Sequence, residues 1–292
     1  MNDRKPTPVP RLMMAAELRR LRDRAGMTGD DVKERLGWST AKLSKIENAR
    51  IGISPTDAEA LLDLYDPGLS PDHRRRLLAL TAHDRPRGWW RAYAGSSPQE
   101  GFAAFLDIEA VARAACLWEA DVVPGLLQTE AYARELIQNW QLIDTALTPE
   151  QIEYRIAIRM KRQQLLEAPS PLHLHIVLDE SVLMRHFGSP AIMRAQLRKL
   201  LEILDMPNVH MQLSLLGRPR QIAESSFTLL MLSEPGDDAG QRLVWMDMGR
   251  DGVLYLDQAA THQYGLIFNQ LARQSIDDIA LIRDTIVSHL PP

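Results

Sequence analysis

The sequence predicts an α+β protein in which an all-α N-terminal bundle is followed by a larger α+β domain with a mostly antiparallel sheet. Residues 14–68 show the apolar spacing of three and four residues that is typical of amphipathic helices. From residue 101 onward, helical segments alternate with short runs of strand periodicity. The chain has 292 residues, of which 45% are hydrophobic, and this is enough apolar material for two cores.

Four helices are expected in the N-terminal bundle. Thr28 and Asp31 fit a capping box, so the second helix begins at about residue 29. Gly37 can adopt the left-handed conformation of a sharp helix exit, and Ser39 caps the third helix. Residues 54–57, Ser-Pro-Thr-Asp, start the fourth helix. The inward apolar positions of the four helices are, in order, Leu18, Leu21 and Ala25; Val32 and Leu36; Leu43 and Ile46; and Ala58, Leu61, Leu62 and Tyr65.

The second and third helices, with the Gly-Trp turn between them, have the form of a helix-turn-helix that reads DNA. Leu43 and Ile46 point inward, so the opposite face of the third helix is free to approach a groove. That face carries small or polar side chains: Thr40, Ala41, Ser44 and Lys45. An ordinary solvated bundle is the alternative, because charge on exposed helix faces is common. The capping box, the glycine turn and the outward Lys42 and Lys45 together favour DNA binding.

Residues 14–66 resemble the Cro/cI-type (XRE) repressor domain, in particular through GWSTAKLSKIE at residues 37–47. In that family the helix after the turn enters the major groove, and the following loop contacts phosphates. The resemblance assigns base edges to Thr40, Ala41 and Lys45, and the DNA backbone to Lys42, Asn48 and Arg50. The complete predicted DNA-binding set is Ser39, Thr40, Ala41, Lys42, Ser44, Lys45, Asn48 and Arg50.

The resemblance also implies a structural ion pair between Arg22 in the first helix and Glu47 at the end of the recognition helix, with no DNA contact from either residue. One position departs from the family. Gly29 stands where members often carry a glutamine that binds a phosphate. The backbone amides at this helix start could still bind phosphate.

The distribution of charge divides the chain at the same place. Residues 1–50 contain 12 Lys and Arg against 7 Asp and Glu, a formal charge of +5. The whole chain is at −4, so the remaining residues carry −9. This distribution is expected when one domain contacts DNA and the other contacts something else. Because one small module neutralises few phosphates, we expect a homodimer on a palindromic operator.

Two further features bear on the cellular compartment. No apolar run of 18 residues is present, and the Pro-rich start predicts a flexible arm over residues 1–13 and not a signal peptide. Cys116 is the single cysteine, which excludes an internal disulfide and a multi-cysteine zinc site. A buried inert thiol is expected there, with a redox role as the alternative. We expect a cytoplasmic, nucleoid-associated protein.

Residues 69–100 are expected to form a helical connector between the helix-turn-helix domain (14–68) and the α+β domain (101–292). A helix begins at about residue 70 and contains the consecutive Arg74, Arg75 and Arg76. Three consecutive residues point in three directions, which favours a solvated helix face over a DNA contact. Trp89 and Trp90 are expected to dock against the larger domain.

The larger domain is expected to alternate helices and strands. Consecutive strands with hairpin-like connectors indicate an antiparallel sheet. Capping boxes are expected at the starts of two helices, formed by Thr148 and Gln151 in the helix at 148–167 and by Ser275 and Asp278 in the last helix. The expected helices are 105–118, 129–139, 148–167, 193–204 and two at the C-terminal end, and the expected strands are 172–178, 209–216, 226–232, 243–248 and 253–256.

About residues 87–288 also resemble a known group. The segments at 118–137 and 178–216, with those at 226–232 and 243–248, resemble the C-terminal domain of uncharacterised function (DUF5753-like) that follows an XRE head in many actinobacterial regulators. The PGLLQT element at residues 124–129 is specific for that group. Pro-Gly makes a turn, two leucines insert into a core and Thr129 caps the next helix, so the role of the element is either structural or functional.

No motif for catalysis stands out. A Gly-rich phosphate loop, a Gly-x-Ser-x-Gly elbow and a His-Glu-x-x-His helix are all lacking, so we expect no enzyme and no cofactor. His173, His175 and His210 could ligate a metal from neighbouring strands, or they are polar residues on a solvated strand face. We expect no metal. The stripe of Arg155, Arg159 and Arg162 faces either solvent or an acidic partner or ligand.

The sequence thus predicts a dimeric, sequence-specific transcriptional regulator whose operator is double-stranded DNA. Its C-terminal domain is expected to sense a small-molecule effector or to dock a small partner protein. Docking is what the resemblance implies, because genes of these regulators often lie beside one for a small protein. The alternative function is an antitoxin-like protein-interaction module whose main role is to bind a cognate small protein.

Overall fold

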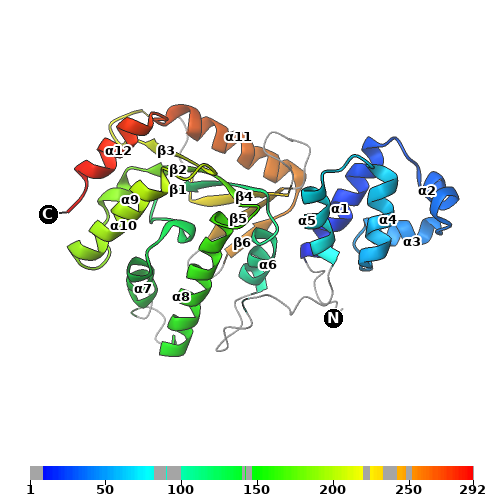
Figure 1. Ribbon diagram of the computed structural model, residues 1–292, viewed down its shortest axis with the longest axis horizontal. Coiled ribbons are helices and arrows are strands. Elements are labelled where there is room, and N and C mark those ends of the chain that lie inside the picture. The colour runs from blue at the N-terminus through cyan, green and yellow to red at the C-terminus, as the bar shows by residue number, and fades with distance from the viewer. Residues whose placement is uncertain are drawn as a thin grey trace.

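The computed structural model contains a helical N-terminal region beside a larger three-layered region (Figure 1). The structure describes residues 9–81, 90, 100–139, 142, 147–219, 224–232, 242–247 and 252–291. The helix-turn-helix lies at the end of the molecule remote from the sheet (Figure 1). The helices of the N-terminal region are α1 (Val9–Arg24), α2 (Gly29–Leu36), α3 (Thr40–Glu47), α4 (Pro55–Tyr65) and α5 (Pro71–Thr81).

The predicted helix ends of the N-terminal region are confirmed. Thr28 and Asp31 form both hydrogen bonds of a capping box at the start of α2. Gly37 ends α2 with φ at 69°, and a side chain there would be strained by the left-handed backbone. Ser39 accepts a hydrogen bond from the Lys42 amide, and Ser54 accepts one from the Asp57 amide.

The first helix starts earlier than expected. We predicted a flexible arm over residues 1–13, but α1 begins at Val9. Met13 and Met14 are buried in the core, at 1% and 2% exposure, and their burial favours helix in the residues that precede them. Pro10 is compatible with the first turn, where its missing N–H is not needed. Residues 1–8 lie outside the described residues.

The larger region is built on one six-stranded sheet, and this sheet is mixed. Its order is β3-β2-β1-β4-β5-β6, in which β1, β2 and β3 are parallel and the pairs β1·β4, β4·β5 and β5·β6 are antiparallel. The strands are β1 (Ala114–Glu119), β2 (His173–Asp179), β3 (Val209–Ser214), β4 (Phe227–Met231), β5 (Arg242–Asp247) and β6 (Gly252–Tyr255).

The prediction of a mostly antiparallel sheet is therefore wrong for β1, β2 and β3, which are parallel, and right for the pairs formed by β4, β5 and β6. Long helical connections link β1 to β2 and β2 to β3, and such crossovers allow parallel pairing. The later strands follow one another directly and pair as the hairpin-like connectors predicted. The elements between the parallel strands are η2 (Gly125–Leu127), α7 (Glu130–Asn139), α8 (Pro149–Gln163), η4 (Gln164–Leu166), α9 (Ser181–Met184) and α10 (Pro190–Ile203).

One expected helix is two elements. We predicted a helix over residues 105–118, but α6 (Glu100–Glu109) ends there and β1 follows. Ala114 to Trp118 form the central strand of the sheet, and Ala115, Leu117 and Trp118 are buried at 3% exposure or less. A strand buried on both faces has no period of two, so its apolar run imitates a buried helix.

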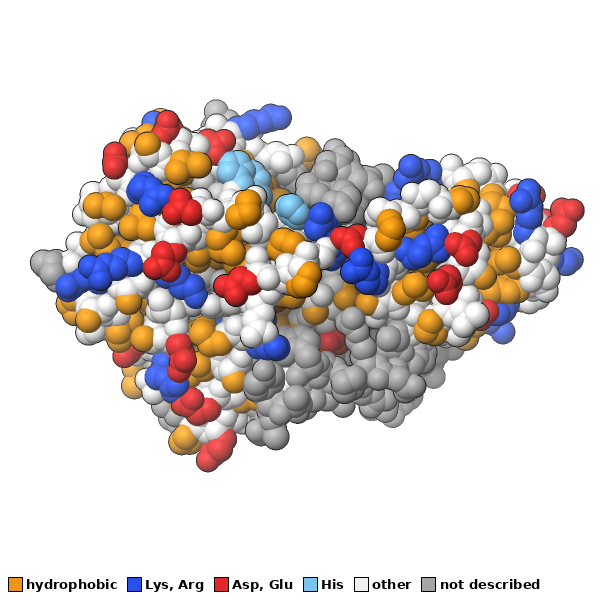
Figure 2. Space-filling model, in the orientation of Figure 1, with side chains coloured by type: hydrophobic (Ala, Val, Ile, Leu, Met, Phe, Trp, Pro, Cys, Tyr) orange, Lys and Arg blue, Asp and Glu red, His pale blue; other side chains and the backbone are white. Residues whose placement is uncertain are grey.

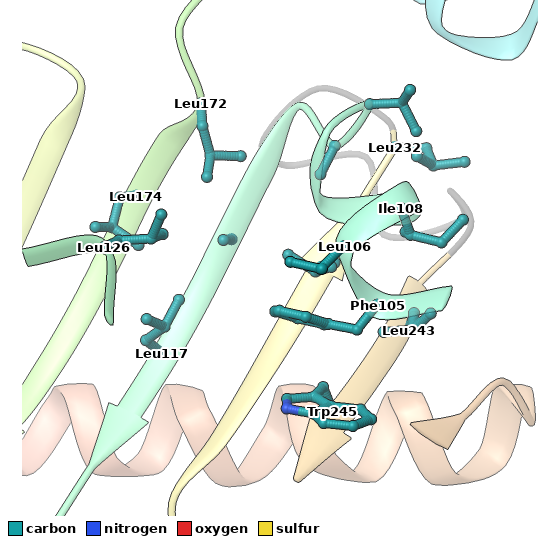
Figure 3. Close-up of a cluster of buried hydrophobic side chains, with 14 of the residues drawn as sticks. Phe105, Leu106, Ile108, Leu117, Leu126, Leu172, Leu174, Leu232, Leu243 and Trp245 are labelled. Carbon is teal, nitrogen blue, oxygen red and sulfur yellow. The ribbon is translucent and has the colours of Figure 1, made fainter. Parts of the chain in front are cut away.

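Helices cover both faces of the sheet. On one face, α6 lies over β1, β4 and β5, with Phe105 stacked on Trp245 at 5.2 Å between ring centroids (Figure 3). On the other face, α11 (Gln258–Gln274) packs Phe268 and Leu271 against Trp118 and Phe227. Figure 1 shows α11 on one side of the sheet and α6, α7 and α8 on the other. The central strands are thus covered by helices on both faces, which explains the near-continuous apolar run of β1.

The last helix, α12 (Ile279–Ser288), is capped differently from our prediction. Asp278 is its N-cap and accepts a hydrogen bond from the Leu281 amide. Ser275 instead ends α11, where its hydroxyl donates to the Leu271 carbonyl. The capping box of Ser275 and Asp278 is therefore wrong, because three residues separate two different helix ends. By contrast, the predicted capping box of Thr148 and Gln151 at α8 is confirmed.

The apolar core runs from the N-terminal region into the larger one. Buried side chains of α1 and α5, including Met14 and Leu77, belong to the same cluster as Phe105 and Leu117. Trp90 is 4% exposed and its Nε1 donates to Asp107 of α6 at 3.3 Å, so its predicted docking is confirmed. Trp89 lies outside the described residues. A search of the described residues finds no helix long and apolar enough to cross a membrane.

Candidate nucleic-acid interface

The eight residues predicted to contact DNA lie on α3 or on the turns at its two ends. Seven are exposed, and Lys42 is half-buried. Leu43 and Ile46, at 3% and 2% exposure, anchor the opposite face. Thr40, Ser44 and Asn48 are spaced by four residues, so they share one side of α3. The structure therefore brings the predicted side chains to one open helix face, which begins with small residues.

The scaffold pair that the resemblance implied is present. Arg22 donates from Nε and Nη2 to the two carboxylate oxygens of Glu47 at 2.8 and 3.0 Å. Its Nη1 donates to the Met27 carbonyl at 2.8 Å. The side chains are only 16% and 8% exposed, and the hydrogen bonds that Arg22 donates to Glu47 raise the pKa of Arg22. This pair fixes the end of α3 to α1 and to the turn before α2.

Lys42 is held within the protein. Its Nζ lies 3.0 Å from Asp57 Oδ2 and 3.7 Å from the centroid of the Trp38 ring. The contact ties α3 to the start of α4. We had assigned Lys42 to the DNA backbone without these two partners. The signal was present in the sequence, since Trp38 lies one turn before Lys42 and Asp57 belongs to the Ser-Pro-Thr-Asp start of α4.

The chain leaves α3 through a fixed turn. Asn48 donates from Nδ2 to the Ser44 carbonyl at 2.7 Å. Ala49 follows with φ at 54°, the one non-glycine residue with positive φ among the described residues, and its side chain is 3% exposed. The Arg50 amide then donates to the Lys45 carbonyl at 2.8 Å. This turn places the exposed Arg50 beside the end of the recognition helix.

The start of α2 is less suited to phosphate than that of a typical helix. The Thr28 amide donates to Asp31 Oδ2 at 2.6 Å, so the capping box already uses it. This hydrogen bond and that of the Thr28 hydroxyl lower the pKa of Asp31. Asp30 and Asp31 therefore place negative charge where Gly29 replaces the phosphate-binding glutamine of the family.

Surface charge on the N-terminal region is mixed. Figure 2 shows Lys and Arg side chains interspersed with Asp and Glu over this end of the molecule. The three consecutive arginines of α5 all have protein partners: Arg74 pairs with Asp63, Arg75 with Asp72, and Arg76 donates to Ser170 Oγ at 2.8 Å. Arg75, at 71% exposure, fits the predicted solvated face, whereas Arg76 bridges to the larger region. None of the three lies on α3.

Two of the three histidines considered as metal ligands pack against each other. The rings of His175 and His210 stack at 4.3 Å between centroids, and His175 Nε2 lies 2.9 Å from Gln212 Oε1. Within the described ranges, no group of three or more His, Cys, Asp or Glu residues is arranged to hold a metal ion. Burial raises the pKa of Cys116 to about 12, which favours the protonated thiol at neutral pH and agrees with the expected inert cysteine.

Two protein-family models match this chain, one in the N-terminal region and one in the larger region. A helix-turn-helix domain model matches residues 14–77. The model of the domain of unknown function DUF5753 matches residues 102–282, more than half of the chain. The chain belongs to the DUF5753 family. Its XRE-type head and its DUF5753 domain agree with the architecture that the sequence predicted, and the head indicates a DNA-binding regulator. No curated protein and no solved structure matches the chain.

The PGLLQT element of the DUF5753 domain is enclosed by side chains from two helices. Gln163 donates to the carbonyls of Gly125 and Gln128 at 3.1 and 2.7 Å. Gln196 donates to the Leu127 carbonyl at 2.8 Å and accepts from the Thr129 amide at 2.7 Å. The turn therefore joins α8 and α10, which supports the structural interpretation of the element.

The arginine stripe of α8 turns inward at two of its three positions. Arg155 is exposed. Arg162 donates to both oxygens of Glu109 at 2.7 Å, and Arg159 donates to Gln128 Oε1 at 3.0 Å. A solvated stripe therefore holds for Arg155 alone. Glu109 and Gln128 lie 53 and 31 residues away in sequence, so helix periodicity alone could not identify them.

Proposed function

We propose that this protein is a sequence-specific transcriptional regulator that binds operator DNA as a homodimer, in the cytoplasm and at the nucleoid. The observation that carries the proposal is the exposed α3 face, which begins with small residues and is fixed by the pair of Arg22 and Glu47. Thr40 and Ala41 are short enough for close approach to base edges, and Lys45 is exposed one turn later. Asn48 and Arg50 belong to the end of α3 and the turn after it, the part that contacts phosphates in the family resembled, which supports their assignment to the DNA backbone.

The connection between the domains supports control of DNA binding by the DUF5753 domain. Asp72 and Arg76 of α5 both hydrogen-bond the Ser170 hydroxyl, at 2.8 Å each. Arg76 also lies 3.4 Å from the Ala112 carbonyl, directly before β1. A change in the sheet or its ligands therefore has a physical route to α5 and the helix-turn-helix.

The test uses the purified full chain and a fluorescent duplex that carries its own promoter region. Specific binding at moderate salt should exceed binding to a scrambled duplex of equal length by at least about 1000-fold. Sedimentation with and without the duplex should give a two-chain mass. A one-chain mass with one-to-one binding of a half-site would overturn the dimer. Equal affinity for both duplexes would overturn the DNA-reading role and favour the antitoxin-like interaction module.

A further inference from the structure

A polar cluster lies at the edge of the sheet where the parallel strands end. β5 is antiparallel to β4, which is antiparallel to β1, so the carboxyl ends of β1 and β5 meet at this edge. Continued past their paired residues, the registers of β1 with β4 and of β4 with β5 align Glu119, Ser226 and Asp247 in one row. The Ala120 amide, next to Glu119, donates to Ser226 Oγ at 3.0 Å, which ties the end of β1 to the residue before β4.

Glu119 lies two residues after Leu117, and Asp247 two residues after Trp245, so their side chains point to the same face of the sheet as these two. Leu117 and Trp245 belong to the core on the side of α6 and α8, and the row therefore faces these helices. Arg159 and Arg162 of α8 reach this edge. Both are packed on the turn before α7, since a Cβ at Gly125 would lie 3.3 Å from Arg162 Nη1 and 3.5 Å from Arg159 Nε. A side chain at Gly125 would press on the Arg162 guanidinium, so glycine favours this close approach.

The two arginines differ in how their charge is matched. Arg162 is bidentate with Glu109 and lies over the Phe105 ring at 5.2 Å. Arg159 has its one hydrogen bond, among the described residues, with the neutral amide of Gln128. Arg159 is half-buried, and a guanidinium partly removed from water without a bonded anion is costly, so an incoming oxyanion would relieve that cost.

The pKa values agree with this geometry. Burial, and then the charge of Arg162, lower the pKa of Arg159 to about 10, although Asp247 and Glu119 act in the opposite direction. Burial raises the pKa of Glu119 to about 8, so this carboxyl is protonated at neutral pH and does not neutralise Arg159. A protonated carboxyl can donate a hydrogen bond to an anion.

We propose that this edge is a binding site for a small molecule with an oxyanion group, a carboxylate or a phosphate, which pairs with Arg159 and accepts a hydrogen bond from Glu119. Strand order reverses beside β1, since the chain adds β2 and β3 on one side and β4 on the other. Ligands of sheets with parallel strands bind outside the carboxyl ends at such a point. The guanidinium fork matches either oxyanion. The site would be the effector site of the proposed regulator, and in that role it rests on the proposed function.

The test measures binding without DNA. Thermal unfolding of the full chain is followed against sodium phosphate and, separately, sodium succinate, with sodium chloride at matched ionic strength as the reference. We expect a saturable rise in Tm with at least one anion. Arg159→Gln should abolish it, and Arg155→Gln, which removes an exposed arginine one turn away, should retain it. The anion that stabilises the protein identifies the oxyanion class.

Two results would overturn the site. One is the lack of a saturable rise in the natural protein with either anion, and the other is an equal rise in Arg159→Gln. If Arg159→Gln fails to fold, Arg159→Lys keeps the charge but loses the fork, and it should weaken apparent anion affinity about tenfold; unchanged affinity would then overturn the proposal. Since no DNA is present, failure here leaves operator binding intact, and failure of operator binding leaves this result intact.

Discussion

The two regions of this molecule use charged side chains in opposite ways. In the head, Lys45 and Arg50 are exposed beside α3, and one ion pair between Arg22 and Glu47 holds that helix in place. In the DUF5753 domain, Arg159 and Arg162 turn inward against a glycine turn and the end of the sheet. An exposed functional face is encoded in a short stretch of sequence, whereas an inward one is assembled from distant segments.

The largest effect is expected from the head's scaffold. Arg22→Ala leaves Glu47 without its partner at 8% exposure, so the free energy of unfolding of the head should fall by about 3 kcal/mol. Affinity for specific and random DNA should fall together, because the whole of α3 loses its support. Urea unfolding and binding isotherms measure both. Arg24→Ala, an exposed arginine in the same helix, is the control and should change neither.

In the DUF5753 domain the corresponding test is pH dependence. The pKa of Glu119 is raised to about 8 in the folded chain from 4.5, so the folded state binds more protons between these values. The protonated Glu119 therefore contributes its whole stabilisation to the fold below about pH 4.5. The free energy of unfolding falls as the pH rises towards 8, by about 2 kcal/mol because the side chain is partly accessible to water. Glu119→Gln should match the natural protein at pH 5 and exceed it at pH 8. Parallel urea-unfolding profiles at both pH values would contradict the assignment.

Base reading by the head should depend on Lys45. Lys45→Ala is expected to lower the ratio of operator to random DNA affinity by about tenfold, with unfolding unchanged, because the side chain is exposed. Competition binding measures this ratio. Lys161→Ala, which removes an exposed lysine of α8 in the other domain, should leave this ratio unchanged. An unchanged ratio in Lys45→Ala would move base reading to Thr40 and Ala41.

The link between the regions should have a smaller effect. Arg76→Ala removes the hydrogen bond to Ser170 and the contact with the Ala112 carbonyl, and should cost about 1 kcal/mol. We expect calorimetry to show the head melting several degrees below the DUF5753 domain. Arg75→Ala is the matched control, as its side chain is 71% exposed. A single unshifted transition for Arg76→Ala would mean that the shared core alone couples the regions.

The smallest expected effect is a difference in the salt dependence of DNA binding between Arg50 and Lys42, the two cations assigned to phosphates. Arg50→Ala should lower the slope of log affinity against log salt by about one, because an exposed cation releases one counterion site. Lys42→Ala should lower it by less, since Asp57 already compensates Lys42 in the free protein. Binding at four salt concentrations measures both slopes. If both substitutions reduced the slope equally, Lys42 would have to break its pair with Asp57 when the protein binds the operator.

The head could be predicted from sequence because its rules are local. Thr28, Gly37 and Ser39 mark helix ends within a few residues, and the ion pair of Arg22 and Glu47 followed from the family pattern. The assignment of Lys42 to the DNA backbone omitted two of its contacts, because Trp38 and Asp57 meet Lys42 only when the helices pack together. Local rules therefore placed the exposed face correctly and left its internal contacts open.

The DUF5753 domain was harder because its contacts are long-range. The helix expected over residues 105–118 failed at the buried central strand, whose apolar run carries no distinctive period. Parallel pairing of β1 with β2 depends on elements 59 residues apart, such as Ala114 and His173, and turn chemistry does not report it. The partners of Arg159 and Arg162 were hidden for the same reason. Local signals were more successful, such as the capping box of Thr148 with Gln151.

The position of α5 has a consequence for the geometry of an operator. Leu77 of α5 is buried in a core that also contains Phe105, and Arg76 hydrogen-bonds Ser170. The head is therefore packed against the larger region and not joined to it by a flexible linker alone. If two chains associate through their DUF5753 domains, the distance between the two α3 helices is set by folded protein and not by a linker. Such a dimer would bind operators with one half-site spacing, and it would bind more weakly to duplexes in which a few base pairs were inserted or removed between the half-sites.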